Sequence, residues 1–253
     1  MLQTGSISVL LSVFELQDAF GVEGDVAEIG VFHGKTLILM AHALNEGERA
    51  VAIDIFGRTL GSDRAMQDQL NANLARFGCA DACDIVIANS LDLSPADFRA
   101  KLGNASVRLF SVDGDHARDA VLHDLALAEA VLAPNGVIAA DDLFNEWYPG
   151  VTEAFYDFCR AGRDGAHDLE PIAFVAPNGP VETGAGKLLF ARKPFARAYK
   201  AGLKLLNQPD LKHCDPFGGF ADVPHFCFRD RPVRRPLDPV LRAILDEIVG
   251  SPV

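Results

Sequence analysis

The chain reads Glu28-Ile29-Gly30-Val31-Phe32-His33-Gly34-Lys35-Thr36 where a short apolar run, residues 26–29, passes into a segment with helical periodicity. The two glycines would let the backbone approach a ligand closely, and the N-terminus of the following helix offers free N–H groups to an anion. The spacing E-x-G-x-x-x-G differs from the dinucleotide-binding pattern G-x-G-x-x-G. It also differs from a P-loop, because Gly30 stands one residue too close to the Gly34-Lys35 pair. We therefore expect a ligand-binding turn of another kind.

The same strand-to-helix pattern repeats along the chain. Strands are predicted at residues 26–29, 50–55, 84–88, 107–113 and 136–140, with helices at about 35–45, 62–77, 95–102, 117–132 and 150–160. Two more apolar runs, 171–175 and 187–191, flank a Pro/Gly-rich turn and predict an antiparallel hairpin. The alternation favours an α/β fold: a Rossmann-like, doubly wound, mostly parallel sheet of seven strands, ending in the antiparallel hairpin.

Two flanking segments lack this alternation. Residues 1–23 contain a short apolar stretch, 7–14, that is followed at once by acids, so we expect a helical extension and neither a signal peptide nor a membrane span. Residues 24–193 are predicted to be the ligand-binding domain. Residues 194–253 become rich in proline and charge, which predicts a surface tail with a terminal helix at about 239–249. The apolar stretch and the tail together favour a homo-oligomer.

Composition narrows the choice of partners. The chain has 253 residues, and 49% of them are hydrophobic, so it can bury a large core. The net charge of −12 argues against a nucleic-acid partner, because phosphate backbones require a basic face. Five cysteines without a C-x-x-C pair predict reduced thiols in the cytoplasm. Cys214 and Cys227 lie near His213 and His225, but their spacing matches no standard zinc finger.

Acidic residues follow two of the predicted strands. Asp113 lies in Ser111-Val112-Asp113-Gly114-Asp115-His116, and Asp141-Asp142 end the run Ala139-Ala140. Neighbouring strands lie roughly 5 Å apart, so these carboxylates would repel one another unless a positive charge lies between them. A divalent cation is the simplest candidate, bound through the oxygens of Asp113, Asp141 and Asp142. Because successive strand residues point to opposite faces, Asp141 and Asp142 need not both be ligands.

His116 follows the first acidic cluster and is the candidate general base, since an imidazole can accept a proton near neutral pH. The alternative is a residue at a helix start that pairs with a carboxylate. Asp115 is expected to cap the following helix. Trp147 and Tyr148 come shortly after the second cluster and either wall an acceptor pocket or serve packing.

Polar side chains also end the second and third strands. Asp54 lies where an acid typically accepts hydrogen bonds from ribose hydroxyls. Asn89 and Ser90 either contact a base or cap a helix. Tight strand–helix packing without a ligand is the alternative for Gly30 and Gly34.

Together, the E-x-G-x-x-x-G turn, the acid on the second strand, and the D-G-D-H and D-D elements resemble class I S-adenosylmethionine (SAM)-dependent methyltransferases over roughly residues 24–192. The run from Asp113 through Val151 is similar to the subfamily of macrolide-sugar O-methyltransferases and cephalosporin-tailoring proteins. The resemblance implies that Glu28, Gly30 and Gly34 hold the methionine part of the cofactor. It also implies a ribose contact from Asp54 and a base at His116. The implied cofactor site comprises Glu28, Gly30, Phe32, His33, Gly34, Asp54, Asn89, Ser90 and Asp113.

The leading hypothesis is therefore a SAM-dependent O-methyltransferase, assisted by Mg²⁺, with His116 as general base. Its acceptor would be a hydroxyl of a sugar or secondary metabolite, and a vicinal diol could chelate the metal. One alternative is a nicotinamide-dependent oxidoreductase or epimerase, which the missing G-x-G-x-x-G and the lack of a core Tyr-x-x-x-Lys pair disfavour. Another is a non-catalytic assembly partner that keeps the cofactor fold.

Overall fold

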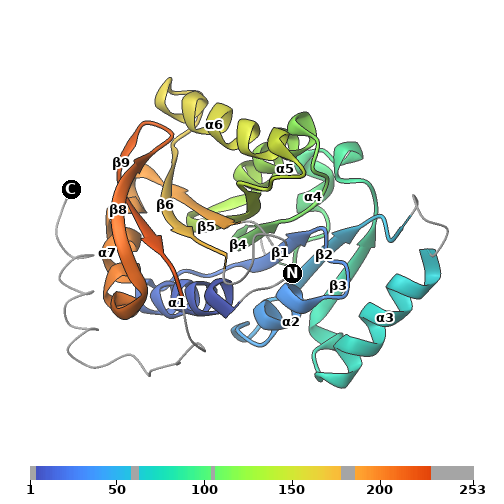
Figure 1. The fold of residues 1–253 in the computed structure, drawn as a ribbon. Coiled ribbons are helices and arrows are strands. Elements are labelled where there is room, and N and C mark those ends of the chain that lie inside the picture. The colour runs from blue at the N-terminus through green and yellow to red at the C-terminus, as the bar shows by residue number, and fades with distance from the viewer. Residues whose placement is uncertain (1–3, 58–62, 104–105, 178–185, 229–253) are drawn as a thin grey trace.

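The computed structural model describes residues 4–57, 63–103, 106–177 and 186–228. Strands and helices alternate along most of this length (Figure 1). The strands are β1 (Asp25–Ile29), β2 (Ala50–Asp54), β3 (Cys83–Ile87), β4 (Val107–Val112), β5 (Leu132–Leu143), β6 (Leu169–Val175), β7 (Gly186–Arg192), β8 (Leu211–Phe217) and β9 (Phe220–Phe226). The α-helices are α1 (Thr4–Phe20), α2 (Lys35–Ala41), α3 (Asp63–Arg76), α4 (Pro95–Arg99), α5 (Arg118–Val131), α6 (Pro149–Arg163) and α7 (Lys193–Leu206). Short 3₁₀ turns are η1 (Ala80–Ala82), η2 (Ser90–Asp92) and η4 (Gln208–Asp210).

All the described strands belong to one sheet, in the order β3-β2-β1-β4-β5-β7-β6-β9-β8. The pairs from β3 to β5 are parallel, and β7 is antiparallel to both β5 and β6. The predicted Rossmann-like α/β fold with an antiparallel hairpin is thus confirmed, but the predicted number of seven strands is wrong, because β8 and β9 extend the described sheet to nine. The order of the strands reverses between β1 and β4, and ligands bind at such a switch point in doubly wound folds.

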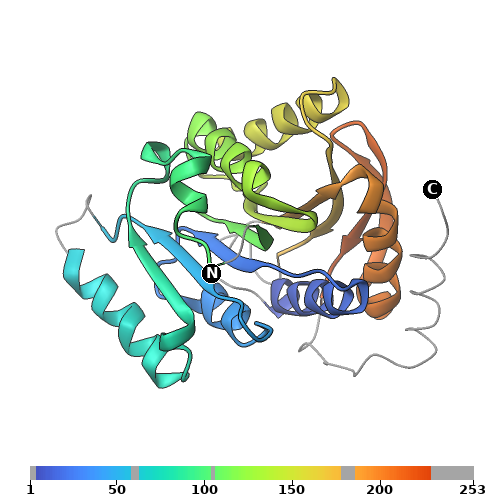
Figure 2. The same ribbon diagram turned by 180° about the vertical axis from the view of Figure 1, so that it is seen from behind.

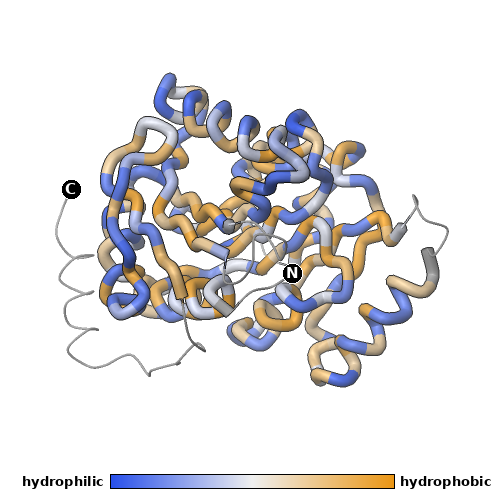
Figure 3. The backbone as a smooth tube through the Cα atoms, viewed as in Figure 1, coloured by the Kyte–Doolittle hydropathy of each residue, from blue (hydrophilic) through white to orange (hydrophobic). Residues whose placement is uncertain are grey.

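Helices cover both faces of the sheet. One core lies between the sheet and α1, α2, α3 and α7, and the other between the sheet and α4, α5 and α6. Figures 1 and 2 show these two layers from opposite sides. In Figure 3 the hydrophobic residues concentrate on the central strands and on the inner sides of the helices. The central strands β1 and β4 are therefore buried on both faces, as is typical of parallel sheets, whereas the edge strand β3 is only half-buried.

The segment after Pro194 differs from the predicted surface tail. Residues 193–206 form α7, and residues 211–226 form a β-hairpin that joins the sheet through a parallel pairing of β9 with β6. Two features hid these strands: Pro216 and Pro224 interrupt them, and β8 is an exposed edge strand without a clean alternation of apolar residues. The predicted terminal helix at 239–249 lies outside the described residues.

Helix α1 is the predicted N-terminal extension, and it packs on its own chain. Val9, Leu10, Val13 and Leu16 are completely buried, in contact with the layer that contains α7 and β6. The apolar stretch is thus already covered, and it no longer supports a homo-oligomer, which stays a prediction. None of the helices within the described ranges is long and apolar enough to cross a membrane.

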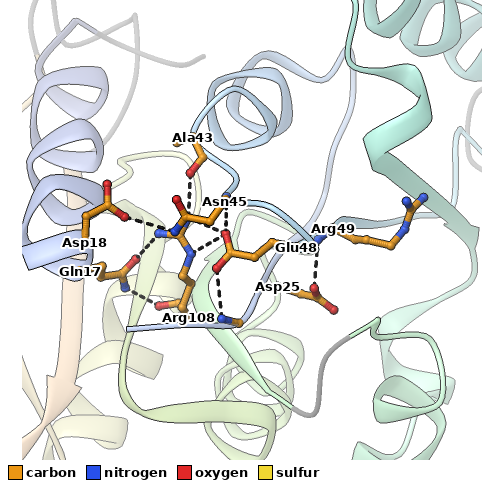
Figure 4. A network of polar contacts seen from close by, with 9 residues as sticks. Gln17, Asp18, Asp25, Ala43, Asn45, Glu48, Arg49 and Arg108 are labelled. Carbon is orange, nitrogen blue, oxygen red and sulfur yellow. Dashed lines mark hydrogen bonds and ion pairs between the residues drawn. The ribbon is translucent and has the colours of Figure 1, made fainter. Parts of the chain in front are cut away.

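A buried arginine ties α1 to the sheet (Figure 4). The guanidinium of Arg108, on β4, donates to Gln17 Oε1 at 3.1 Å, to Glu48 Oε2 at 2.7 Å and to the carbonyl of Ala43 at 2.7 Å. Gln17 Nε2 donates in return to the Arg108 carbonyl at 2.6 Å. Since Arg108 is fully buried, these bonds replace its hydration and fix α1 and the turn before β2 against β4.

Replacement of Arg108 tests this network. We expect Arg108→Met to lower the free energy of unfolding by roughly 3–5 kcal/mol, because it leaves the Glu48 carboxylate buried without its partner. The matched control is Arg160→Met, which removes an exposed partner of Asp157 and should cost no more than about 1 kcal/mol. Urea denaturation measures both. Equal losses in the two variants would contradict the assigned role of Arg108.

Candidate active site

The turn after β1 lies against the end of β4. Gly30 has φ 81°, and its N–H donates to the carbonyl of Ile53 at 2.9 Å, while the N–H of Asp113 donates to Ile29 at 2.9 Å. A Cβ on Gly30 would lie 1.7 Å from the carbonyl oxygen of Asp113. Both the positive φ and this close approach require glycine. At the switch point of the sheet, the backbone of the turn after β1 therefore packs directly against the backbone at the end of β4.

Asp54 braces the same turn from β2. Its carboxylate accepts the N–H of Phe32 at 2.8 Å and the N–H of Phe56 at 2.7 Å. Phe32 has a positive φ of 49°, and its exposed ring stacks on His33 at 3.7 Å. Gly34 begins α2 with φ 81°, and a Cβ there would meet the Leu70 side chain at 2.4 Å. The predicted cofactor residues of the first two strands thus lie together, and packing within the protein already accounts for both glycines.

Asn89 and Ser90 lie one strand further out, beyond β3. Asn89 Oδ1 accepts the N–H of Leu91 at 3.1 Å and so caps η2. Ser90 is buried, and its hydroxyl forms a hydrogen bond with Asp124. Burial raises the pKa of Asp124, and the bond with Ser90 partly offsets that rise. Asn89 therefore acts as a helix cap, which is one of the two roles predicted for Asn89 and Ser90.

A buried lysine lies among the predicted acidic residues. The register aligns Val112 of β4 with Ala140 of β5, and Ala140 with Leu188 of β7, so Asp113, Asp141 and Lys187 occupy the next positions along three adjacent strands. Lys187 Nζ forms an ion pair with Asp141, and only 1% of the lysine side chain is exposed. Burial alone would lower the pKa of Lys187, but the surrounding carboxylates outweigh it and raise that pKa.

Glu28 forms the floor of this charged cluster. It is buried on β1, and Ser111 Oγ donates to its Oε1 at 3.3 Å. Its Oε2 has no hydrogen-bond partner within the described part of the chain. Burial, followed by the charge of Asp113, raises the pKa of Glu28 well above its usual range. Burial and the charge of Asp141 likewise raise the pKa of Asp113.

His116 and Asp142 form a second pair beside the cluster. His116 Nε2 lies 2.6 Å from Asp142 Oδ2, and Asn145 Nδ2 donates to Asp142 Oδ1 at 3.1 Å. The hydrogen bond with Asp142 raises the pKa of His116. Burial would raise the pKa of Asp142, but its bond with His116 outweighs this and lowers that pKa. Asp113 offers a third ligand atom, and one donor atom from each of the three residues lies within 4.8 Å of the others.

The structure therefore divides the three predicted metal ligands. Asp113 and Asp142 lie together with His116, whereas Asp141 is paired with Lys187. The chain does turn at Asp142, where φ is 69°, and Asp141 lines the same pocket, but its carboxylate is paired with Lys187 and is not part of the cluster of donor atoms. The ligand set remains a prediction, and the geometry favours Asp113 and Asp142 over Asp141.

A small pocket opens above His116, and it is lined by Val112, Asp113, Gly114, Asp115, His116, Val121, Asp141, Asp142, Val151 and Phe155. Asp115 Oδ1 accepts the N–H of Ala117 at 2.7 Å, which braces the turn before α5. The predicted capping role is wrong, because Ala117 is the N-cap residue of α5 and no side chain caps that helix. The ring of Tyr148 stacks on His116 at 4.3 Å, and Trp147 is 70% exposed. The pocket thus combines ionisable and apolar side chains, and Tyr148 contacts it through the ring of His116.

Residues 27–143 match the family model of a methyltransferase domain. The chain carries a methyltransferase domain. This match confirms the predicted enzyme class and the resemblance to class I methyltransferases, and its range includes every predicted site residue. No curated protein matches the chain significantly.

Solved structures of other methyltransferases share the fold. TomG, an O-methyltransferase from Streptomyces achromogenes involved in tomaymycin synthesis and solved with SAM, gives a TM-score of 0.55 at 19% identity, over 72% of this chain and 78% of TomG. An O-methyltransferase from Bacillus cereus, solved with S-adenosylhomocysteine (SAH), gives 0.57 at 15% identity, over 75% and 80% of the two chains. CalS11, a TDP-rhamnose 3′-O-methyltransferase of calicheamicin biosynthesis, gives 0.50 at 21% identity, over 74% and 80%.

Substitution of Lys187, measured in buffer that contains EDTA, tests the role of this residue. We expect Lys187→Met to lower the free energy of unfolding at pH 8 by roughly 3–5 kcal/mol, because several carboxylates lose a buried counter-charge. The loss should shrink as the pH falls. The raised pKa values of Glu28 and Asp113 rise further without the lysine, so both carboxyls take up protons in the folded state and their repulsion disappears.

The matched control is Lys200→Met. Lys200 is also buried, but it pairs with a single carboxylate, that of Glu170, at 2.9 Å. We expect a smaller loss that varies less between pH 8 and pH 5. Chemical denaturation at several pH values measures both variants. A Lys187→Met loss that stays constant with pH would disprove the proposed charge balance.

Proposed function

We propose that this methyltransferase is a SAM-dependent O-methyltransferase, assisted by Mg²⁺, that acts on a hydroxyl of a sugar or secondary metabolite. The observation that carries the proposal is the His116–Asp142 pair beside Asp113, in a pocket at the carboxyl edge of the methyltransferase domain. A proton acceptor and oxygen ligands meet there, next to the glycine turn of β1. This combination suits O-methylation, because a neutral hydroxyl is a poor nucleophile that both a base and a Lewis-acid metal can activate.

The residues of the first turn fit a bound SAM. Glu28 Oε2 is a buried acceptor that has no partner within the described ranges, so a donor group of the cofactor would satisfy it. Asp54 lies at the end of β2, the usual position of a ribose-binding acid, and its two backbone bonds leave lone pairs for hydroxyl groups. TomG with SAM and the Bacillus cereus enzyme with SAH support the same choice of cofactor.

The residues of the pocket also fit a hard divalent cation. Asp113 and Asp142 supply carboxylate oxygens, which Mg²⁺ prefers, and we propose these two as its ligands. A bound Mg²⁺ would act as a Lewis acid that lowers the pKa of the acceptor hydroxyl. We assign Asp141 a different role, because it would have to leave Lys187 to become a ligand. Its pair with Lys187 balances the charge behind the pocket and so positions Asp113.

His116 would remove the proton from the acceptor hydroxyl. Its hydrogen bond with Asp142 orients the imidazole and stabilises the imidazolium that forms, as the raised pKa of His116 indicates. The Tyr148 ring stacked on His116 limits its rotation, and the exposed Trp147 offers an apolar wall to a ring-shaped acceptor. The activities described for CalS11 and TomG favour a sugar or another secondary metabolite as acceptor.

We further propose that residues 24–193 form the SAM-binding unit and that α1 and the β8–β9 hairpin complete the acceptor side.

The five cysteines are all free, which suits a reducing compartment such as the cytoplasm.

Calorimetric titration tests the cofactor. We expect SAM and SAH to bind with one site per chain and NAD to show no binding. Asp54→Ala should weaken SAH by at least about tenfold, since it releases both the turn and the proposed ribose contact. The exposed Asp92→Ala is the matched control and should bind SAH normally. Binding of NAD but not SAH would overturn the proposal.

Turnover of acceptors with vicinal hydroxyls, followed by release of SAH, tests the chemistry. We expect His116→Ala to retain SAH affinity and to lose about 10²–10⁴-fold in turnover, the usual contribution of a general base. Asp142→Asn should abolish stimulation by Mg²⁺. The neighbouring Asp115→Asn should retain both, because the Asp115 side chain bonds to the N–H of Ala117 in the turn before α5 and an asparagine oxygen can accept the same bond. Full turnover in His116→Ala would exclude this residue as the base.

A further inference from the structure

The β8–β9 hairpin brings together three metal-binding side chains that lie outside the methyltransferase pocket. The antiparallel register places His213 of β8 directly opposite His225 of β9. Asp215 follows His213 by two residues without a register shift between them, so all three side chains share one face of the hairpin. Directly opposed side chains of an antiparallel pair are close neighbours. A metal ion could therefore bridge the two strands.

The distances support this arrangement. His213 Nε2 lies 3.0 Å from Asp215 Oδ2, and the two imidazole rings are 4.7 Å apart between centroids. One donor atom from each of the three residues lies within 4.8 Å of the other two. The side chains of His213 and Asp215 are 46% and 59% exposed, so an ion can enter from solvent.

His225 provides an independent indication of a ligand. Its Nε2 is buried, and no described residue offers it a hydrogen bond. A buried ring nitrogen without a partner is uncommon in folded proteins. The neutral imidazole is the form that binds metals, and burial of the ring nitrogen disfavours the charged form of His225. The Phe174 ring packs edge-on against it at 5.1 Å and fixes its position.

The cysteines that lie nearest in the sequence do not belong to this set. Cys214 lies between His213 and Asp215 on β8, so its side chain points to the opposite face, where it bonds with Asp222. The donors are two histidines and one aspartate and include no cysteine. The sequence therefore shows no zinc-finger spacing, although the three donors meet in the folded hairpin.

We propose that His213, Asp215 and His225 bind a divalent transition metal ion of the zinc type. Two imidazoles and one carboxylate suit Zn²⁺, Co²⁺ or Ni²⁺ better than Mg²⁺, which prefers an all-oxygen site. Three protein ligands leave a coordination position open to water or to an acceptor. The ion would join β8 to β9 beside Phe174, which contacts Phe144, two residues after Asp142. The site is independent of the proposed Mg²⁺ site.

Titration of the tag-free full chain, stripped with EDTA, tests this site. We expect one equivalent of Zn²⁺ to bind in the presence of excess Mg²⁺. The affinity should fall by at least about tenfold in His213→Gln, since loss of even a supporting residue costs a metal site this much. Thermal unfolding should shift upward with Zn²⁺ in the wild-type chain but not in this variant. Because His213 is exposed, its replacement should not prevent folding.

Three controls separate this site from other zinc-binding positions. Cys214→Ser, the exposed His42→Gln, and His116→Ala with Asp142→Asn should all retain the hairpin affinity. The absorption spectrum with Co²⁺ should show coordination by nitrogen and oxygen, without thiolate charge-transfer bands. Loss of Zn²⁺ binding only in the His116/Asp142 variant, thiolate bands, or no binding by the wild-type chain would overturn the proposal.

Discussion

The Lys187 ammonium holds several carboxylates together at the edge of the sheet where the candidate active site lies. Glu28, Asp113 and Asp141 come from β1, β4 and β5, and each would repel the others in a buried environment. Because β7 runs antiparallel to β5, its first residues reach the same edge as the carboxyl ends of the parallel strands. One buried cation thus stabilises an arrangement that water cannot, since unpaired buried charges cost several kcal/mol each.

This charge balance divides the acidic residues between two tasks. Asp141 is paired with Lys187, and Glu28 is buried beside the glycine turn, where its Oε2 has no partner among the described residues. Asp142, one residue further on, adopts a positive φ and pairs with His116 on the side of the pocket. In the proposed methyl transfer, Lys187, Glu28 and Asp141 therefore support the reacting residues without taking part in the reaction. The hairpin at the far side of the sheet adds a second, nitrogen-rich donor set with a different preference for metals.

Much of the parallel half could be predicted because its patterns are local. Buried strands appear as apolar runs, and the turns between strand and helix contain the glycines and acids that lie at one edge. The position of Lys187 at this edge could have been found as well, because the predicted hairpin starts its second strand there. Which carboxylate the lysine pairs with could not be found in this way. The hairpin of β8 and β9 could not be found in this way, because prolines and exposure remove the alternation that marks a strand.

By itself the sequence determined the Rossmann-like architecture, the methyltransferase class and the residues that gather at the switch point, because these follow from periodicity and from short motifs. Only the tertiary structure decided which partner each ionisable group has. Asp141 meets Lys187, Asp142 meets His116, and His213 meets His225. These pairings join residues from different strands or turns, and they depend on strand direction and register, which composition and spacing do not encode.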